Sequence, residues 1–138
     1  MRQDQSDVLE KDVLNMSLEL TAKTNDETGE VWIDGDKATK KLEKGTPPTS
    51  FEFTLKNKTK PKLTVAFSSL DAQDNVQCPP ASGSTSEQIT SVVIGTDTAS
   101  FVDQNNNTSP MTVCYQWNFT CSDGQTPAFD PVIDNRGR

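Results

Sequence analysis

Histidine is absent from the 138 residues of this chain. Without imidazole, neither a Ser-His-Asp nor a Cys-His catalytic device can be assembled, and no histidine-ligated zinc, copper or non-haem iron site can form. Electron-transfer copper sandwiches hold their metal with histidine, so the chain is not a copper carrier of that kind. The composition therefore excludes these classes of enzyme and metalloprotein before any pattern is considered.

Basic side chains are missing from residues 63–135, which hold eight carboxylates and no Lys or Arg. The whole chain has 13 basic and 20 acidic residues, which gives a formal net charge of −7. An acidic surface repels phosphate backbones, so nucleic acid is not expected as a partner.

Long apolar runs are missing as well. None approaches the length of about 18 residues that a membrane helix needs, so membrane insertion is not expected. The opening MRQDQSDVLEKDVLNMS contains no apolar core of the kind found in signal peptides. As written, the chain is expected to be cytoplasmic. A location outside the cell requires processing or an export route that leaves no such segment.

Cysteine is scarce, and the three that are present cannot all pair within one chain. Cys114 and Cys121 point to opposite faces of one expected strand, about 23 Å apart along it, so they are not expected to bridge each other. Cys78, in a proline-rich segment, can reach either of them. The odd count favours free, buried thiols in a reducing compartment over a disulfide. A thiol-based redox protein ranks third among the functions considered, because no basic residue lies nearby in the sequence to activate a thiol.

Alternation with a period of two dominates from Met16 onward. In residues 111–121, MTVCYQWNFTC, six apolar residues share one parity and five polar or small residues share the other, as in a half-buried strand. Tyr115 and Trp117 share parity with apolar neighbours and are therefore predicted to lie in the core. Ile89, Val92, Val93 and Ile94 form the centre of another segment. Strands are also predicted over residues 16–22, 30–34, 50–56, 62–68, 88–95, 99–102 and 128–134.

These segments predict an all-β fold of about seven or eight strands, as a two-sheet antiparallel sandwich of immunoglobulin-like or Greek-key type. A barrel is the competing closure. Residues 50–56 and 62–68, joined by the polar NKTKP, are predicted to form a β-hairpin. Pro131 restricts the last strand to an edge or to irregular pairing. Residues 1–15 are predicted to form a short helix or a tail, and residues 16–138 a single domain.

A long irregular connection is predicted over residues 70–88, because Pro79, Pro80 and Gly83 interrupt regular structure. A loop of such length in a compact domain is either functional or loosely ordered. Acidic residues at strand ends offer oxygen ligands for calcium, the one cofactor considered, although no stretch matches the twelve-residue calcium loop. The candidate calcium ligands are Asp34, Asp36, Asp71, Asp74, Asp97 and Asp103.

Trp32 has the opposite parity to Val31 and Ile33 and is therefore the aromatic residue that is free to stack on a sugar ring. No phosphate-binding loop, internal repeat or catalytic constellation is found in the sequence. We therefore expect a non-catalytic binding or assembly module that acts through a protein partner or through self-association. The alternative is a calcium-dependent adhesion domain or a carbohydrate-binding domain.

Overall fold

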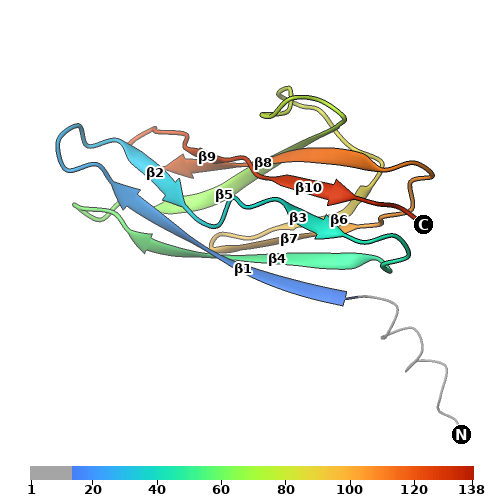
Figure 1. Ribbon diagram of the computed structural model, residues 1–138. Coiled ribbons are helices and arrows are strands. Elements are labelled where there is room, and N and C mark those ends of the chain that lie inside the picture. The colour runs from blue at the N-terminus through green and yellow to red at the C-terminus, as the bar shows by residue number, and fades with distance from the viewer. Residues whose placement is uncertain (1–13) are drawn as a thin grey trace, which may run out of the picture.

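Two β-sheets packed face to face make up the computed structural model, which describes residues 14–138 (Figure 1). The ten strands are β1 (Leu14–Thr24), β2 (Val31–Asp34), β3 (Lys40–Leu42), β4 (Thr49–Lys58), β5 (Val65–Asp74), β6 (Ile89–Ile94), β7 (Thr98–Asp103), β8 (Met111–Cys121), β9 (Ala128–Phe129) and β10 (Val132–Asn135). The first sheet has the order β2-β1-β4-β7-β6 and the second the order β3-β10-β8-β5, with β9 paired to β8. The predicted sandwich is confirmed, and the separate sheets exclude a barrel.

The predicted helix or tail over residues 1–15 falls largely outside the described residues. Its last two residues, Leu14 and Asn15, belong to β1, which begins before the expected Met16. Within residues 14–138 the structure contains no helix with the length and apolar character needed to cross a membrane.

Strand number and direction differ from the prediction. There are ten strands rather than seven or eight, because the three-residue β3 has no alternation to reveal it and because Asp130 and Pro131 split the last segment into β9 and β10. The sheets are mixed rather than purely antiparallel, since β1 runs parallel to β4 and β3 runs parallel to β10. Between β1 and β4 the chain crosses to the second sheet and back, which supplies the long connection that parallel neighbours require.

The predicted hairpin between residues 50–56 and 62–68 is wrong. β4 pairs with β1 and β7 in the first sheet, whereas β5 pairs with β8 in the second. Residues 59–64 therefore cross from one sheet to the other, and the buried Thr59 hydroxyl ties this crossing together: it donates to Asn57 Oδ1 at 2.7 Å and accepts from Leu63 N–H at 2.9 Å. Alternation specifies which face of a strand is apolar but not which sheet the strand joins.

Aromatic rings from both sheets meet in the core. Tyr115 and Trp117 are 1% and 0% exposed, as predicted from their parity. Phe53 of the first sheet meets both rings edge-on, with centroid distances of 5.9 Å to Tyr115 and 5.5 Å to Trp117. Phe67 of the second sheet meets Trp117 at 5.3 Å. Such edge-to-face pairs each add about 0.5–1.5 kcal/mol to the hydrophobic burial of the rings.

A substitution of Phe53 tests this core. We expect Phe53→Ala to lower the free energy of unfolding by about 3–5 kcal/mol, because it removes a buried ring and leaves a cavity between the sheets. Denaturant unfolding measures the change, and Glu52→Gln, at the exposed neighbouring position, is expected to stay within about 0.5 kcal/mol of the wild type. A similar loss in both variants would contradict the assignment of Phe53 to the core.

Candidate functional site

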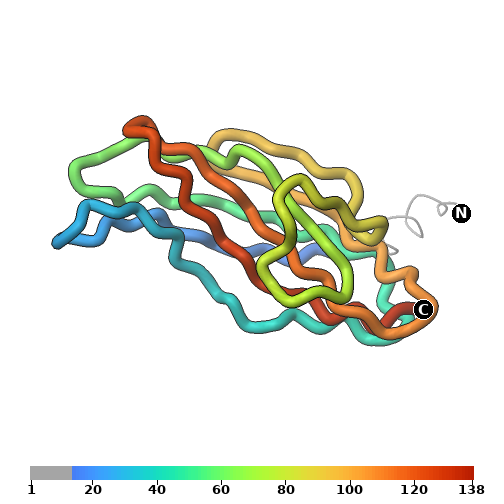
Figure 2. Tube along the Cα trace, turned by 90° about the horizontal axis from the view of Figure 1, so that it is seen from above, coloured from blue at the N-terminus to red at the C-terminus, as the bar shows by residue number. Residues whose placement is uncertain are grey.

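The irregular connection begins later than the sequence predicted, because β5 continues to Asp74. The remaining residues, 75–88, form what we call the anchored loop. Figure 2, which views the molecule from above Figure 1, shows this loop lying across the outer side of the second sheet. Its proline residues and Gly83 keep it irregular, as expected.

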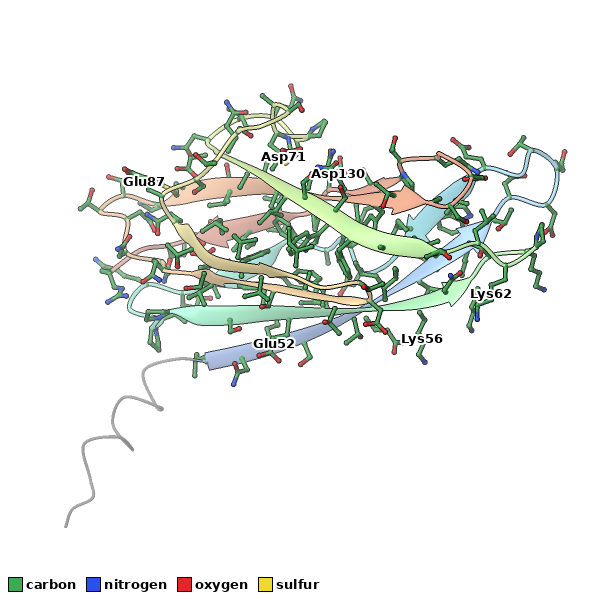
Figure 3. All side chains as sticks on the ribbon, turned by 180° about the vertical axis from the view of Figure 1, so that it is seen from behind. Glu52, Lys56, Lys62, Asp71, Glu87 and Asp130 are labelled. Carbon is green, nitrogen blue, oxygen red and sulfur yellow. A yellow bond between two sulfur atoms is a disulfide. The ribbon has the colours of Figure 1, made fainter. Side chains whose placement is uncertain are left out.

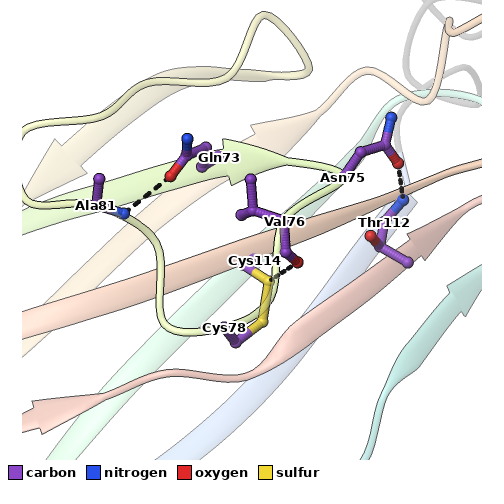
Figure 4. Close-up of a disulfide and its surroundings, with 7 residues drawn as sticks. All are labelled: Gln73, Asn75, Val76, Cys78, Ala81, Thr112 and Cys114. Carbon is purple, nitrogen blue, oxygen red and sulfur yellow. Dashed lines mark hydrogen bonds between the residues drawn. A yellow bond between two sulfur atoms is a disulfide. The ribbon is translucent and has the colours of Figure 1, made fainter.

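A disulfide between Cys78 and Cys114 fastens the anchored loop to β8, with the Cα atoms 5.5 Å apart (Figure 4). The expectation of three free thiols is therefore wrong for these two residues. Cys114 lies on the face of β8 opposite the core, as its parity predicted, and the loop folds back to bring Cys78 against it, which leaves Cys114 1% exposed. Cys121 is a buried free thiol, as expected, and burial together with the charge of Asp123 raises its pKa. A raised pKa disfavours the nucleophilic thiolate that a redox function requires.

Hydrogen bonds hold the rest of the anchored loop against β5 and β8. Gly83 adopts a φ of +79°, a left-handed conformation that favours glycine, and its N–H donates to Asp71 at 2.9 Å. Ser86 donates through its hydroxyl to Asp74 at 2.6 Å. The loop is therefore fastened at several points along its length. Further contacts are Ala81 N–H to Gln73 Oε1 (2.9 Å), Ala72 N–H to Ser84 O (3.1 Å), Asn75 N–H to Thr112 O (2.8 Å) and Thr112 N–H to Asn75 Oδ1 (3.1 Å).

A groove of 410 Å³ lies between the anchored loop and the outer face of the second sheet. Most of the residues that line it are polar and uncharged, and among the described residues at its wall none is basic. The groove therefore offers hydroxyl and amide groups rather than charge. Its central lining residues are Ser69, Asp71, Pro79, Pro80, Gln116 and Asn118.

A chain of hydrogen bonds orders the floor of this groove. Gln116 donates to Asn118 Oδ1 at 2.6 Å, and the Asn118 amide nitrogen donates to Ser69 Oγ at 3.0 Å and to Asp71 Oδ2 at 2.9 Å. Asp71 is 6% exposed, and its second oxygen accepts from Gly83. Both carboxylate oxygens are thus occupied, and Asp71 orients Asn118 instead of presenting a free charge.

The sequence singled out Asp71 in this groove, but as a calcium ligand, and it did not single out Gln116 or Asn118. Both belong to the polar parity of β8, and this parity indicates only that they lie on the outward face of the strand. The signal that was available is the Gln-x-Asn spacing at residues 116–118, which places two amides on one face.

Two of the calcium candidates, Asp34 and Asp36, form ion pairs with lysine side chains. Lys23 Nζ lies 2.7 Å from Asp34 Oδ2, and Lys40 Nζ lies 2.9 Å from Asp36 Oδ2. Hydrogen bonds from Lys40 and from the Ala38 amide lower the pKa of Asp36. Each of the two carboxylates is therefore engaged by a different lysine.

The other four candidates are also dispersed. Asp71 and Asp74 hold the anchored loop, Asp97 lines a separate pocket beside Lys62, and Asp103 is buried. Within residues 14–138 no group of three acidic or cysteine side chains is placed to share a metal ion.

Trp32 is exposed, with 45% of its surface accessible. Lys23 lies over its ring, 5.4 Å from the centroid, and also pairs with Asp34. A cation over the ring competes with a sugar for the same aromatic face. The geometry therefore gives less support to a stacking site at Trp32 than to the groove.

A buried polar cluster joins the end of β7 to the end of β10, and of its residues the sequence singled out only Asp103, as a calcium candidate. Asp103 has no exposed surface. Its Oδ1 accepts hydrogen bonds from the Asn135 side-chain amide at 2.7 Å and from the Asn105 backbone N–H at 3.0 Å. Asn105 in turn accepts from Gly137 N–H at 2.8 Å. Burial raises the pKa of Asp103 to about 6, although the hydrogen bonds from Asn135 and Asn105 oppose this shift.

No family model matches this chain, and no curated protein gives a significant match to it. Because one sandwich architecture hosts many unrelated functions, the function has to be argued from the groove and the surface themselves.

The disulfide gives the first test of the site. We expect reduction, or the double substitution Cys78→Ala with Cys114→Ala, to lower the free energy of unfolding by about 2–4 kcal/mol, because the bridge closes a long loop. A thiol titration of the unfolded, unreduced protein should find one free thiol of the three. Reductant should not change the double variant further. Three reactive thiols without reductant would contradict the bridge.

Asp103 gives a pH test. Its pKa is raised on folding from 3.8 to about 6, so the folded protein takes up this proton before the unfolded chain does, and stability rises as the pH falls from 7 towards 4.5. We expect a gain of about 2 kcal/mol from this group over that interval. Chemical denaturation at both pH values measures it, and Asp103→Asn should lose the gain. An identical pH dependence in the wild type and Asp103→Asn would refute the assignment.

Proposed function

We propose that this protein is a non-catalytic binding module and that its ligand lies in the groove beneath the anchored loop. The observation that carries the proposal is a 410 Å³ groove between a regular sheet and a loop fastened by a disulfide and several hydrogen bonds. Loops on a rigid scaffold are common binding sites, and a loop that is already ordered loses little entropy when a ligand binds. In this proposal the sandwich carries a ligand-binding loop, as immunoglobulin-like domains do.

We infer that the ligand is an uncharged, hydroxyl-rich molecule of the carbohydrate class. Amide and hydroxyl groups such as those of Gln116, Asn118 and Ser69 both donate and accept hydrogen bonds, as sugar hydroxyls do. The rings of Pro79 and Pro80 add apolar surface on the loop side. The acidic half of the chain repels anions, which disfavours phosphorylated or carboxylated ligands. Among the sequence alternatives, carbohydrate binding is thus favoured over a calcium-dependent mechanism.

Two observations support a non-catalytic role. The free thiol Cys121 is buried with a raised pKa, so it is not poised as a nucleophile. Asp71, the carboxylate at the groove, is buried and accepts one hydrogen bond on each oxygen, from Gly83 and Asn118, so its contacts are those of a structural group.

The disulfide is relevant to the cellular compartment in which the protein works. Structural disulfides persist in oxidising environments and are rare in the cytosol. We therefore infer that the protein works in an oxidising compartment, in place of the cytoplasmic location expected from the sequence.

Asn118→Ala tests the proposal. Binding of the oxidised protein to an array of neutral oligosaccharides, followed by titration calorimetry with the best one, should show at least about a tenfold loss of affinity in this variant, or about 1.4 kcal/mol. The loss is expected because alanine removes the remaining acceptor site of Asn118 Oδ1 and the two hydrogen bonds that order Ser69 and Asp71 in the floor of the groove. Asn106→Ala, at an exposed asparagine outside the groove, is the matched control. Equal affinity in both variants, or no binding to any sugar, would eliminate the groove as a carbohydrate site.

A further inference from the structure

β6 ends the first sheet and carries a cluster of exposed apolar residues. Five large apolar side chains are exposed in residues 14–138, and three of them are consecutive: Val92, Val93 and Ile94, with 44%, 62% and 41% of their surface accessible. The sequence predicted these residues as the centre of a strand, and the strand is present. Its position at the edge of the sheet leaves them in contact with solvent.

Three of the other edge strands contain charged residues, and the fourth, β9, is only two residues long. β2 contains Asp34, β3 contains Lys40 and Lys41, and β5 contains Asp71 and Asp74. β6, with the sequence ITSVVI, contains no charged residue. Because charged side chains on an edge strand discourage pairing with another chain, β6 is the edge that remains open to it.

The local geometry defines how much of this edge is usable. A bulge between Thr90 and Val93, with Ser91 at a φ of 54°, interrupts the pairing of β6 with β7. The exposed apolar part of the edge is therefore short: Val92 lies within the bulge, and regular pairing resumes at Val93 and Ile94. A hollow of 250 Å³ lies on the face of the sheet over β7, between β4 and Val93 of β6; its lining includes Glu52, Thr54, Val93, Thr98 and Ser100.

The charges around this edge are acidic. Glu87 precedes β6, Asp97 follows it, and Glu52 lies at the hollow; Figure 3 shows Glu87 near the start of β6 and Glu52 on the outer side of β4. Lys62 shares a pocket with Asp97 but forms no ion pair with it among the described residues. A segment that carries basic residues on both sides of an apolar stretch is complementary to this arrangement.

A second copy of this chain fits less well. In a pair of β6 strands the flanks of both copies would be acidic, because residues 87–97 contain Glu87 and Asp97 and no Lys or Arg. Like charges in opposed positions destabilise strand pairing.

We propose that β6 is a docking edge for an extended, apolar segment of a partner protein that has Lys or Arg on both flanks. The segment adds a sixth strand to the first sheet through the backbone groups of residues 92–94, and its apolar side chains cover Val93 and Ile94. This inference concerns a different surface from the groove and does not depend on it.

Peptide binding tests the proposal. The probe is a synthetic peptide that alternates valine with threonine between paired terminal lysines, and its partner probe replaces each lysine with glutamate. Fluorescence anisotropy with the full-length, oxidised protein should detect binding of the lysine peptide, weakened by salt, and at least about tenfold weaker binding of the glutamate peptide. Hydrogen exchange should show slower exchange of the amides of residues 92–94 with the lysine peptide bound.

Val93→Lys should weaken binding of the lysine peptide by at least about tenfold, because it puts a like charge on the docking edge. Val93 is mostly exposed, so the melting temperature of this variant should match the wild type. Leu14→Lys, which changes an exposed apolar residue on β1, is the control and should bind normally. No binding of the lysine peptide, equal binding of both peptides or an unaffected Val93→Lys variant would each overturn the proposal. So would a wild-type dimer that Val93→Lys dissociates, because the occupant would then be a second copy.

Discussion

The packing of Trp117 between Phe53 of the first sheet and Phe67 of the second is the contact on which the rest of this structure depends. Trp117 has no exposed surface, so β8 cannot shift by one residue without moving its largest side chain from the core to solvent. The register of β8 in turn decides what its other face presents. Cys114, Gln116 and Asn118 point outward because Tyr115, Trp117 and Phe119 point inward.

The outward face of β8 supplies both the anchor and the floor of the groove. Cys114 holds the loop through Cys78, while Gln116 and Asn118 form the hydrogen-bonded floor beneath it. One strand thus couples the stability of the core to the order of the loop. Since Asp71 joins Asn118 to the backbone of the loop, the floor and the roof of the groove are ordered together.

The acidic half of the chain limits what either surface can bind. Residues 63–135 contribute most of the groove and all of β6, and they contain no basic side chain. At the groove, where the one carboxylate is occupied, this composition favours a neutral ligand. At β6, where Glu87 and Asp97 flank an apolar stretch, it favours a basic one. The same charge bias therefore supports two different ligand classes on two surfaces.

The period-two pattern of the sequence determined the fold class and the side of each strand that is buried, because alternation reports the face of a side chain directly. Tyr115 and Trp117 in the core, and Cys114 and Cys121 on opposite faces, follow from it. Alternation does not indicate which strands pair with each other. The crossing between β4 and β5 and the parallel β1–β4 pair are therefore seen only in the tertiary structure. Long-range contacts also decided that Cys78 bridges Cys114 and that Asp71 orders a groove: both depend on where the anchored loop folds back, which no local pattern encodes.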